Sequence, residues 1–292
     1  MDSAMMYALA AIALWSTNAV VAKHVFAELT IAQIQLWQFL GATVVFALMR
    51  LSPDLSEKNA GNWWPTALAG IVGITATMVF QYIAFSIGPI AQVNLVAYSW
   101  PLVLALILAR DGTLPEPIRI VVLASTGFIG VALVIDPFSS QLGPWHVGWG
   151  HLAAFASALA MASYCYLVKQ APVRQVSAHL FGAVVGTAIA AGLFLQNGTT
   201  WQGSFELHVM AFYLGVGPIG LGYFFWACAL RRDRRGRTAV LGFLTPVAST
   251  LLLVLSGEYL SGLTIVGAAL VIGCCAIVTW ESNAQKHEPA RS

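Results

Sequence analysis

Polar and aromatic side chains recur at helical spacing inside the long apolar stretches of this chain. Asn94, Tyr98 and Pro101 stand at positions i, i+4 and i+7, and therefore share one face of a helix. Met78 and Tyr82 share a face in the preceding stretch. Amides and phenols inside a hydrocarbon layer need polar partners, so we expect these faces to point inward. Their chemistry is the binding of a solute by stacking and hydrogen bonding.

The candidate binding residues come from both halves of the chain, and none of them carries a formal charge. They are Trp15, Asn18, Met78, Gln81, Tyr82, Asn94, Tyr98, Trp100, Tyr164, Tyr223, Trp226 and Thr245. For any single residue, interhelical hydrogen bonding or ordinary packing is an equally good explanation. For the whole set, a central cavity explains better why so many polar groups gather at mid-depth. Uncharged walls suit a neutral or zwitterionic solute with an apolar body, and exclude dicarboxylates and sugar phosphates.

Residue types that could support catalysis or metal binding do not converge in the sequence. His146 and His151 are five residues apart, which is poor spacing for two ligands on one helix face. The cysteines show no ligand or disulfide spacing and lie inside apolar stretches: Cys165, Cys228, Cys274 and Cys275. We therefore predict that the protein is not an enzyme and has no metal and no cofactor.

Groups that could couple transport to an ion gradient are also missing from the middle of the apolar stretches. No Asp, Glu, Lys or Arg stands at the centre of a stretch, and no buried carboxylate or histidine is evident as a proton relay. Transport or exchange driven by the gradient of the solute itself is the expectation. The alternative is coupling through a peripheral group, for which the candidates are Lys23, Asp136 and Glu258.

The composition is that of a polytopic membrane protein. Of the 292 residues, 59% are hydrophobic and 9% are charged, whereas a soluble domain carries roughly 25% charged residues. The apolar runs are too long and too uniform for barrel strands, so they are helices. We predict an all-α fold with ten transmembrane helices, at residues 4–24, 30–50, 63–86, 89–109, 117–136, 148–169, 177–195, 207–230, 237–256 and 261–281.

Lysine and arginine are distributed asymmetrically about these ten helices. If the N-terminus is cytoplasmic, every lysine and arginine except Lys23 falls on the cytoplasmic side, including the run 231–237. This positive-inside pattern predicts that both termini are cytoplasmic. The arginine run could also bind anionic lipid, although fixing the topology explains it sufficiently.

The chain is predicted to contain one five-helix unit twice. Pro101 and Pro246 are 145 residues apart, and each divides its helix into a polar half and an apolar half. We assign the repeats to residues 1–145 and 146–282, followed by a cytoplasmic tail at 283–292. Because five is an odd number of crossings, the second repeat must enter the membrane from the opposite side. Inverted repeats of this kind are typical of secondary transporters.

Prolines and glycines at repeat-related positions have predicted roles. Pro101 and Pro246 each remove one backbone hydrogen bond, so we expect a kink at each that acts as a hinge for closing one side. Gly70 and Gly215, also 145 residues apart, are expected to let helices approach closely.

Three motifs resemble the EamA repeats of the drug/metabolite transporter superfamily. LWSTNAVVAK (Leu14–Lys23) is similar to the first-helix pattern of that family. TPVASTLLLVLSGEYLS (Thr245–Ser261) resembles its proline helix, which ends in Gly-Glu. The first repeat departs from this pattern, because it has Asp111-Gly112-Thr113 and no glutamate there. NLVAYSWP (Asn94–Pro101) looks most like the bacterial aromatic amino-acid exporters of this family.

The resemblance implies a secondary transporter that works by alternating access around a central cavity. It points to an exporter of aromatic amino acids or similar amphipathic metabolites in the inner membrane of a bacterium. The alternatives are a multidrug or other neutral-metabolite exporter of the same fold and, more remotely, a channel or an intramembrane enzyme. The expected partners are a large neutral or aromatic amino acid and membrane lipid, with no nucleic acid and no obligatory protein partner.

Overall fold

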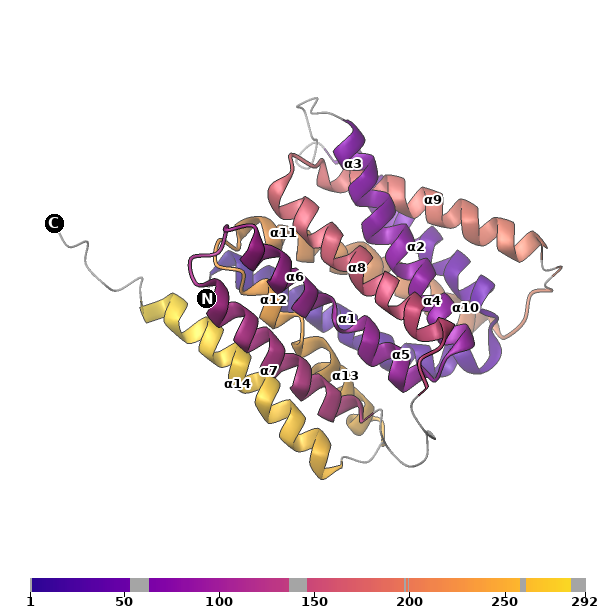
Figure 1. The fold of residues 1–292 in the computed structure, drawn as a ribbon. Helices are drawn as coiled ribbons and strands as arrows, with labels where there is room; N and C mark the ends of the chain where they lie inside the picture. Colours follow the sequence, from indigo (N-terminus) through magenta and orange to yellow (C-terminus); the bar gives the residue numbers. More distant parts are fainter. Residues whose placement is uncertain are drawn as a thin grey trace.

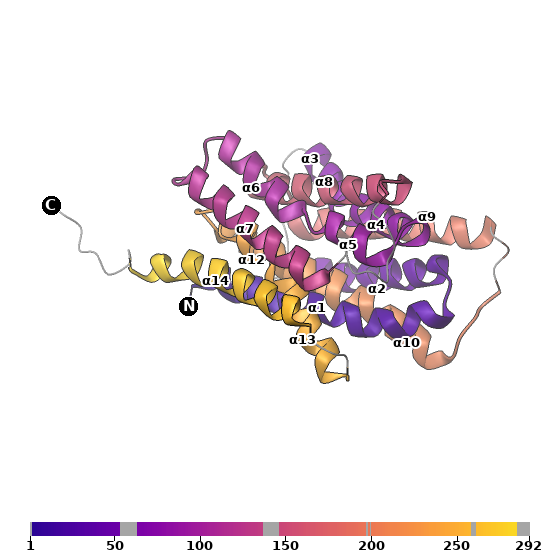
Figure 2. The same ribbon diagram turned by 60° about the horizontal axis from the view of Figure 1, so that its bottom comes forward.

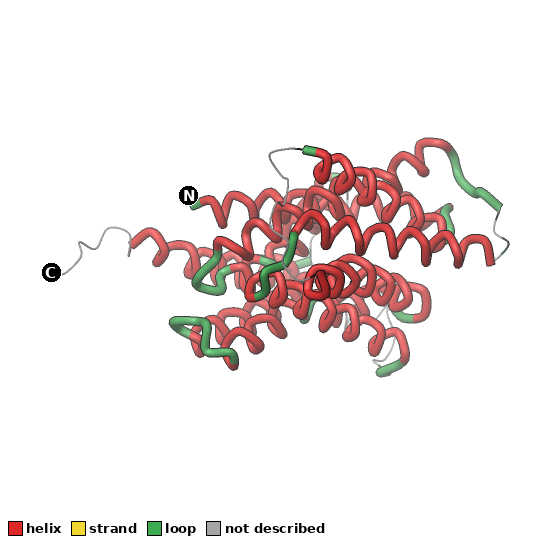
Figure 3. The backbone as a smooth tube through the Cα atoms, turned by 90° about the horizontal axis from the view of Figure 1, so that it is seen from above, coloured by secondary structure: helices red, strands yellow, loops and turns green. Residues whose placement is uncertain are grey.

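The computed structural model describes residues 2–52, 63–136, 146–196, 198, 200–257 and 261–284. The described chain folds into helices joined by short connections (Figure 3). Among the described residues, ten helices are long and apolar enough to cross a membrane, which confirms the predicted number. Glu258 and the last residues of the predicted tail, 285–292, lie outside the described residues.

The helices of the two halves follow one another in the same order. The first half contains α1 (Ser3–Glu28), α2 (Ile31–Leu51), α3 (Trp63–Gly70), η2 (Ile71–Ala76), α4 (Thr77–Ile87), α5 (Ile90–Ala97), α6 (Trp100–Arg110) and α7 (Pro117–Ile135). The second contains α8 (Trp149–Gln170), α9 (Gln175–Gln196), α10 (Phe205–Leu214), η4 (Gly215–Gly222), α11 (Tyr223–Arg232), α12 (Thr238–Leu241), α13 (Leu244–Leu255) and α14 (Gly262–Ala284). The last helices, α7 and α14, pack side by side along one edge (Figures 1 and 2).

Two helix ends differ from the prediction by more than two residues. The first helix continues to Glu28, four residues beyond the expected end at 24, because nothing in its last turn stops it before Leu29. The last helix continues to Ala284 and so extends into the predicted tail. The first of these differences bears on the site, since it places Lys23 more than one turn before the end of the helix.

The two proline-containing spans are each divided into two helices, at corresponding places. α5 and α6 are separated at Tyr98 and Ser99, and α12 and α13 at Gly242 and Phe243. Pro101 stands in the first turn of α6, where its missing N–H would have had no helical partner. The predicted kinks are therefore real, but each break comes just before its proline.

The third and eighth spans each contain a π-helical segment that the sequence analysis missed. These segments are η2, which contains one glycine, and η4, which contains four. Such wide turns leave carbonyls that side chains can reach, and they are frequent at functional sites. Trp15 on α1 donates its indole N–H to the carbonyl of Pro218 at 2.9 Å, and Ser157 on α8 donates its hydroxyl to the carbonyl of Thr77 at 2.8 Å.

Close helix contacts at glycine interlock the two halves. A Cβ added to Gly70 would lie 2.0 Å from the carbonyl oxygen of Ala178 on α9, and one added to Gly215 would lie 2.2 Å from that of Gln38 on α2. These contacts confirm the predicted role of Gly70 and Gly215. The third span (α3 and η2) thus packs on α9 of the second half. In the same way, the eighth span (α10 and η4) packs on α2 of the first half.

The first helices of the halves, α1 and α8, run in opposite directions. α1 begins where the carboxylate of Asp2 meets Arg237, at 2.7 Å. α8 ends at the same place, where Lys169 donates to the backbone carbonyl of Asp233. Inverted repeats require such an antiparallel pair. We call this end of the bundle the Asp2 end, and the opposite end the Lys23 end.

Candidate functional site: a central cavity

A cavity of about 1120 Å³ lies between the two halves and reaches the Lys23 end. Its lining includes Phe26 near the end of α1, Ile90 where α5 begins, and Val254 near the end of α13. Along α1 the lining begins only at Trp15, so the first half of that helix lies below the cavity. A volume of this order exceeds that of many small-molecule sites, which span roughly 300–1,000 Å³.

Ten of the twelve predicted binding residues line this cavity. They are Trp15, Asn18, Met78, Gln81, Tyr82, Asn94, Tyr98, Trp100, Tyr223 and Thr245. They come from α1, α4, α5, α6, α11 and α13, and thus from both repeats. Of the predicted hinges, Pro246 lines the cavity and Pro101 is buried beside it.

An aromatic floor closes the cavity toward the Asp2 end. The ring of Trp15 meets Tyr223 edge-on with centroids 5.7 Å apart, and Trp100 at 6.5 Å. Edge-to-face pairs of this kind are favourable beyond the area that they bury. The hydrogen bond from Trp15 to Pro218 fixes the orientation of the indole. The floor is therefore preorganised to present apolar surface to a solute.

Tyr164 and Trp226 do not line the cavity, although both were predicted to bind the solute. Trp226 is fully buried behind Trp15, 5.0 Å away, and its indole N–H points to the sulfur of Cys165. Tyr164 is also fully buried and packs against Tyr223. Tyr223 and Trp226 are three residues apart, which rotates their side chains by roughly 60°. Tyr223 therefore faces the cavity, and Trp226 packs behind Trp15.

The expectation that the core contains no buried histidine is wrong. His179, on α9, is fully buried, and its Nε2 lies 2.6 Å from the hydroxyl of Tyr164. Its Nδ1 has no hydrogen-bond partner, and its ring packs on Phe46. The sequence offered one signal, a lone histidine near the start of the predicted helix 177–195, but its partner lies in another helix. Since His179 does not line the cavity, contact with a solute is not its role in this conformation.

The expectation of a cavity without formal charge is also wrong, because Lys23 lines it. α1 continues past Lys23, and Ala19, Lys23 and Phe26 follow one another at helical spacing on the face that lines the cavity. One ammonium group can pair with one carboxylate of a solute. Among the described residues, no three His, Cys, Asp or Glu side chains converge to hold a metal.

Several polar lining residues were missed by the sequence analysis. They are Gln38, Thr77, Ser157, Ser249, Thr250 and Thr264. The buried side-chain oxygens of Gln38 and Thr245 have no hydrogen-bond partner in the described structure. Unpaired buried polar atoms are rare in native folds, and they suit a site that receives a polar ligand. Gln38 was missed because glutamines recur every two or three residues along α2, so that spacing alone does not identify the inward one.

The two ends of the bundle are packed differently. At the Asp2 end, α12 packs against α6 and α7, and a Cβ on Gly242 would lie 2.6 Å from the Trp100 ring. The repeat-related helices at the Lys23 end are α5 against α13 and α14, and among the described residues these make no contact of comparable extent. The described part of the bundle is therefore closed at the Asp2 end and open at the Lys23 end.

Comparisons with known proteins agree with this architecture. Residues 2–136 and 148–280 each match the EamA-like transporter family, so the family unit occurs twice. A curated relative, the aromatic amino acid exporter YddG of Ancylobacter novellus, is 30% identical over 286 residues, covering 95% of this chain and 97% of the relative. A crystal structure of a protein 26% identical in sequence superposes with a TM-score of 0.81 over 99% of both chains. Two family matches that together span most of the chain, and ten membrane-spanning helices, show that this multi-pass membrane protein belongs to the EamA-like transporter family.

Proposed function

We propose that this protein exports large neutral amino acids, above all aromatic ones, by alternating access around the central cavity. Both termini lie in the cytoplasm of a bacterial cell, and the two halves act as inverted repeats. The observation that carries the proposal is the chemical division of the cavity. It combines an aromatic floor with polar walls and a single lysine.

This division matches the two ends of an amino acid with a large apolar side chain. The ring of the substrate stacks on Trp15, Trp100 and Tyr223, while its polar head meets the amides and hydroxyls of the walls. Lys23 pairs with the single carboxylate. A dicarboxylate or sugar phosphate would place a second anionic group without a cation opposite it. The relative named as an aromatic amino acid exporter supports the same substrate class.

The difference between the two ends supports alternating access. The cavity opens at the Lys23 end, and packing of α12 against α6 and α7 closes the Asp2 end. If the arginine-rich side is cytoplasmic, this is the state that releases an exported solute. Repacking around the two broken spans would exchange the open end for the closed one.

An exporter of amphipathic drugs is the second candidate. Met78 and Met161 both line the cavity, and methionine adapts to ligands of different shape. A substrate panel separates the two candidates directly.

The test is counterflow into proteoliposomes that contain the purified full-length protein. Phenylalanine, tyrosine, tryptophan and methionine should exchange with saturation, whereas succinate and glucose 6-phosphate should not. Trp100→Phe should raise KM for tryptophan about three- to tenfold, because it weakens an aromatic contact. Trp64→Phe is the matched control, since Trp64 is 64% exposed and does not line the cavity. Preference for an anionic metabolite or for hydrophobic cations would refute the proposal.

A further inference from the structure

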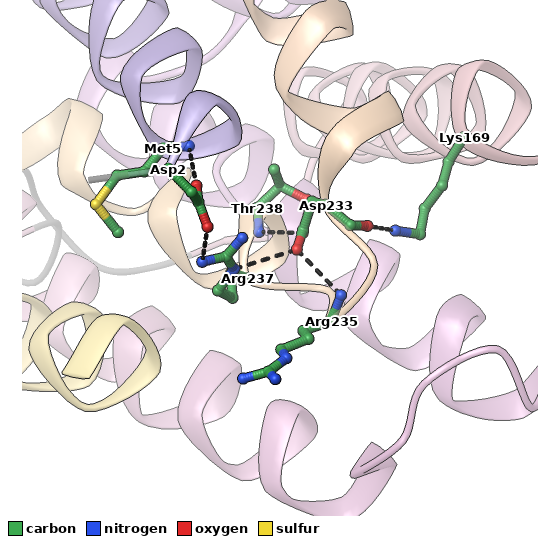
Figure 4. Close-up of polar contacts among 7 residues, drawn as sticks. All are labelled: Asp2, Met5, Lys169, Asp233, Arg235, Arg237 and Thr238. Atoms are coloured by element: carbon green, nitrogen blue, oxygen red, sulfur yellow. Dashed lines mark hydrogen bonds and ion pairs between the residues drawn. The ribbon is translucent and has the colours of Figure 1, made fainter. Parts of the chain in front are cut away.

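A buried ion-pair cluster joins three segments at the Asp2 end (Figure 4). Arg237, in the connection between α11 and α12, is 7% exposed. Its Nη1 lies 2.7 Å from Oδ2 of Asp2, and its Nε lies 3.4 Å from Oδ1 of Asp233. Burial alone would lower the pKa of Arg237, but the hydrogen bonds and charges of Asp2 and Asp233 outweigh it, so the pKa is raised. The guanidinium therefore stays charged.

Asp233 organises the rest of the cluster. Its Oδ2 accepts hydrogen bonds from the backbone N–H and the hydroxyl of Thr238, both at 2.8 Å, and its Oδ1 accepts from the N–H of Arg235 at 3.2 Å. Its backbone carbonyl accepts from Lys169 at the end of α8. Asp233 thus fixes the start of α12 and ties it to the end of α8, while Arg237 ties it to α1 of the first half (Figure 4).

Asp2 serves α1 in two separable ways. Its Oδ1 caps the helix by accepting from the N–H of Met5 at 2.9 Å, and its Oδ2 pairs with Arg237. Asparagine caps helices as well as aspartate does but carries no charge. The cap and the ion pair can therefore be tested independently.

The repeat-related place at the open end holds hydrogen bonds between polar groups. Gln92 stands 145 positions before Arg237, and Gly148, which precedes α8, stands 146 positions after Asp2. There, Gln92 contacts His151 through a hydrogen bond of 3.2 Å, and Nδ1 of His151 accepts from the N–H of Gly148. The same place in the fold thus holds an ion-pair cluster where the bundle is closed, and hydrogen bonds among Gln92, His151 and Gly148 where it is open.

We propose that the Asp2–Arg237–Asp233 cluster is a latch that holds the Asp2 end closed and must separate before a solute can pass through that end. The proposal rests on the alternating-access function. Separating the cluster would leave the buried charge of Arg237 without its carboxylate partner, which is unfavourable. The intact pair therefore favours the closed state. Removing the charge of Asp2 shifts the population toward the state open at the Asp2 end.

The experiment measures access to Cys165, a fully buried native thiol. Cys165 lies one helical turn before Lys169 on the same face of α8, just behind the aromatic floor. The full-length protein, tagged at its C-terminus, is treated with a membrane-impermeant maleimide. Peptide mass spectrometry then gives the rate of labelling at each cysteine. No substrate is needed, so the result does not depend on which solute the protein carries.

Asp2→Asn should speed labelling at Cys165 roughly five- to tenfold relative to the parent. Asp2→Glu, which keeps the charge, should label slowly, as the parent does. Glu116→Gln is the matched control, because it removes an exposed pair with Arg119, 2.7 Å long, outside the cluster. It should leave the rate unchanged.

Equal labelling of Cys165 in Asp2→Asn and the parent would overturn the latch. The latch would also be overturned if Asp2→Asn increased the labelling rate at Cys274 of α14 as much as at Cys165. Such a result would indicate that the whole bundle is loosened and not that one end opens. If aromatic amino acids are not transported but Asp2→Asn still labels faster, the substrate proposal fails and the latch survives. If they are transported and labelling does not change, only the latch fails.

Discussion

Replacing Gly215 with alanine tests the contact that interlocks the two halves. The new Cβ would lie 2.2 Å from the carbonyl oxygen of Gln38 and 2.9 Å from Cα of Gly41, both on α2. Ordinary contact distances are about 3.5 Å, so the two helices would have to separate by about 1 Å. The obstacle is backbone, which cannot rotate away. Overpacking of this kind costs about 1–3 kcal/mol, and we expect the upper part of that range.

The assay is thermal unfolding in detergent, followed with a thiol-reactive dye. It suits this chain because all four cysteines are buried and become reactive when the bundle unfolds. A loss of about 2–3 kcal/mol should lower Tm by roughly 5 °C or more. Gly192→Ala on α9 is the control, since its Cβ would meet nothing within 4 Å. It should be neutral or slightly stabilising, because alanine favours a helix by up to about 1 kcal/mol over glycine. A Gly215→Ala protein as stable as Gly192→Ala would refute the reasoning.

Three further predictions concern transport. Lys23→Gln should raise KM for phenylalanine about three- to tenfold in counterflow while hardly changing KM for phenylalanine amide, because only the acid has a carboxylate to pair with the lysine. Equal increases in KM for the acid and the amide would exclude the pairing. Pro101→Ala should lower the maximal rate more than it changes KM, since it restores a backbone donor at the break between α5 and α6; an altered KM at an unchanged rate would assign Pro101 to shaping the cavity. Efflux from substrate-loaded vesicles should not change when an ionophore collapses the pH difference, because the buried His179 lies outside the cavity lining. This expectation would be reversed if substrate accumulated in proportion to an imposed pH difference and the accumulation were lost in His179→Gln.

Much of the fold could be predicted from the sequence because a bilayer imposes a simple rule. Each crossing needs about 20 apolar residues in a helix, so ten spans can be counted directly. The recurrence of Pro101 at Pro246, and of Gly70 at Gly215, reveals the duplication without any contact being known. Ten of the twelve candidate residues chosen from the sequence, most of them by helical spacing, line the cavity.

The remaining features depend on helices that are distant in the sequence. Trp226 and Tyr223 have the same local pattern, and only the packing of α1 and α8 around α11 decides which of them faces the cavity. His179 is a lone polar residue in an apolar helix until Tyr164 of another helix is placed beside it. The distinction between an open and a closed end could not be predicted from the sequence either, because Asp2, Asp233 and Arg237 come together only in the folded bundle. Local periodicity determines the helices and their inward faces, whereas the choice among contacts of similar energy is made only when the whole bundle assembles.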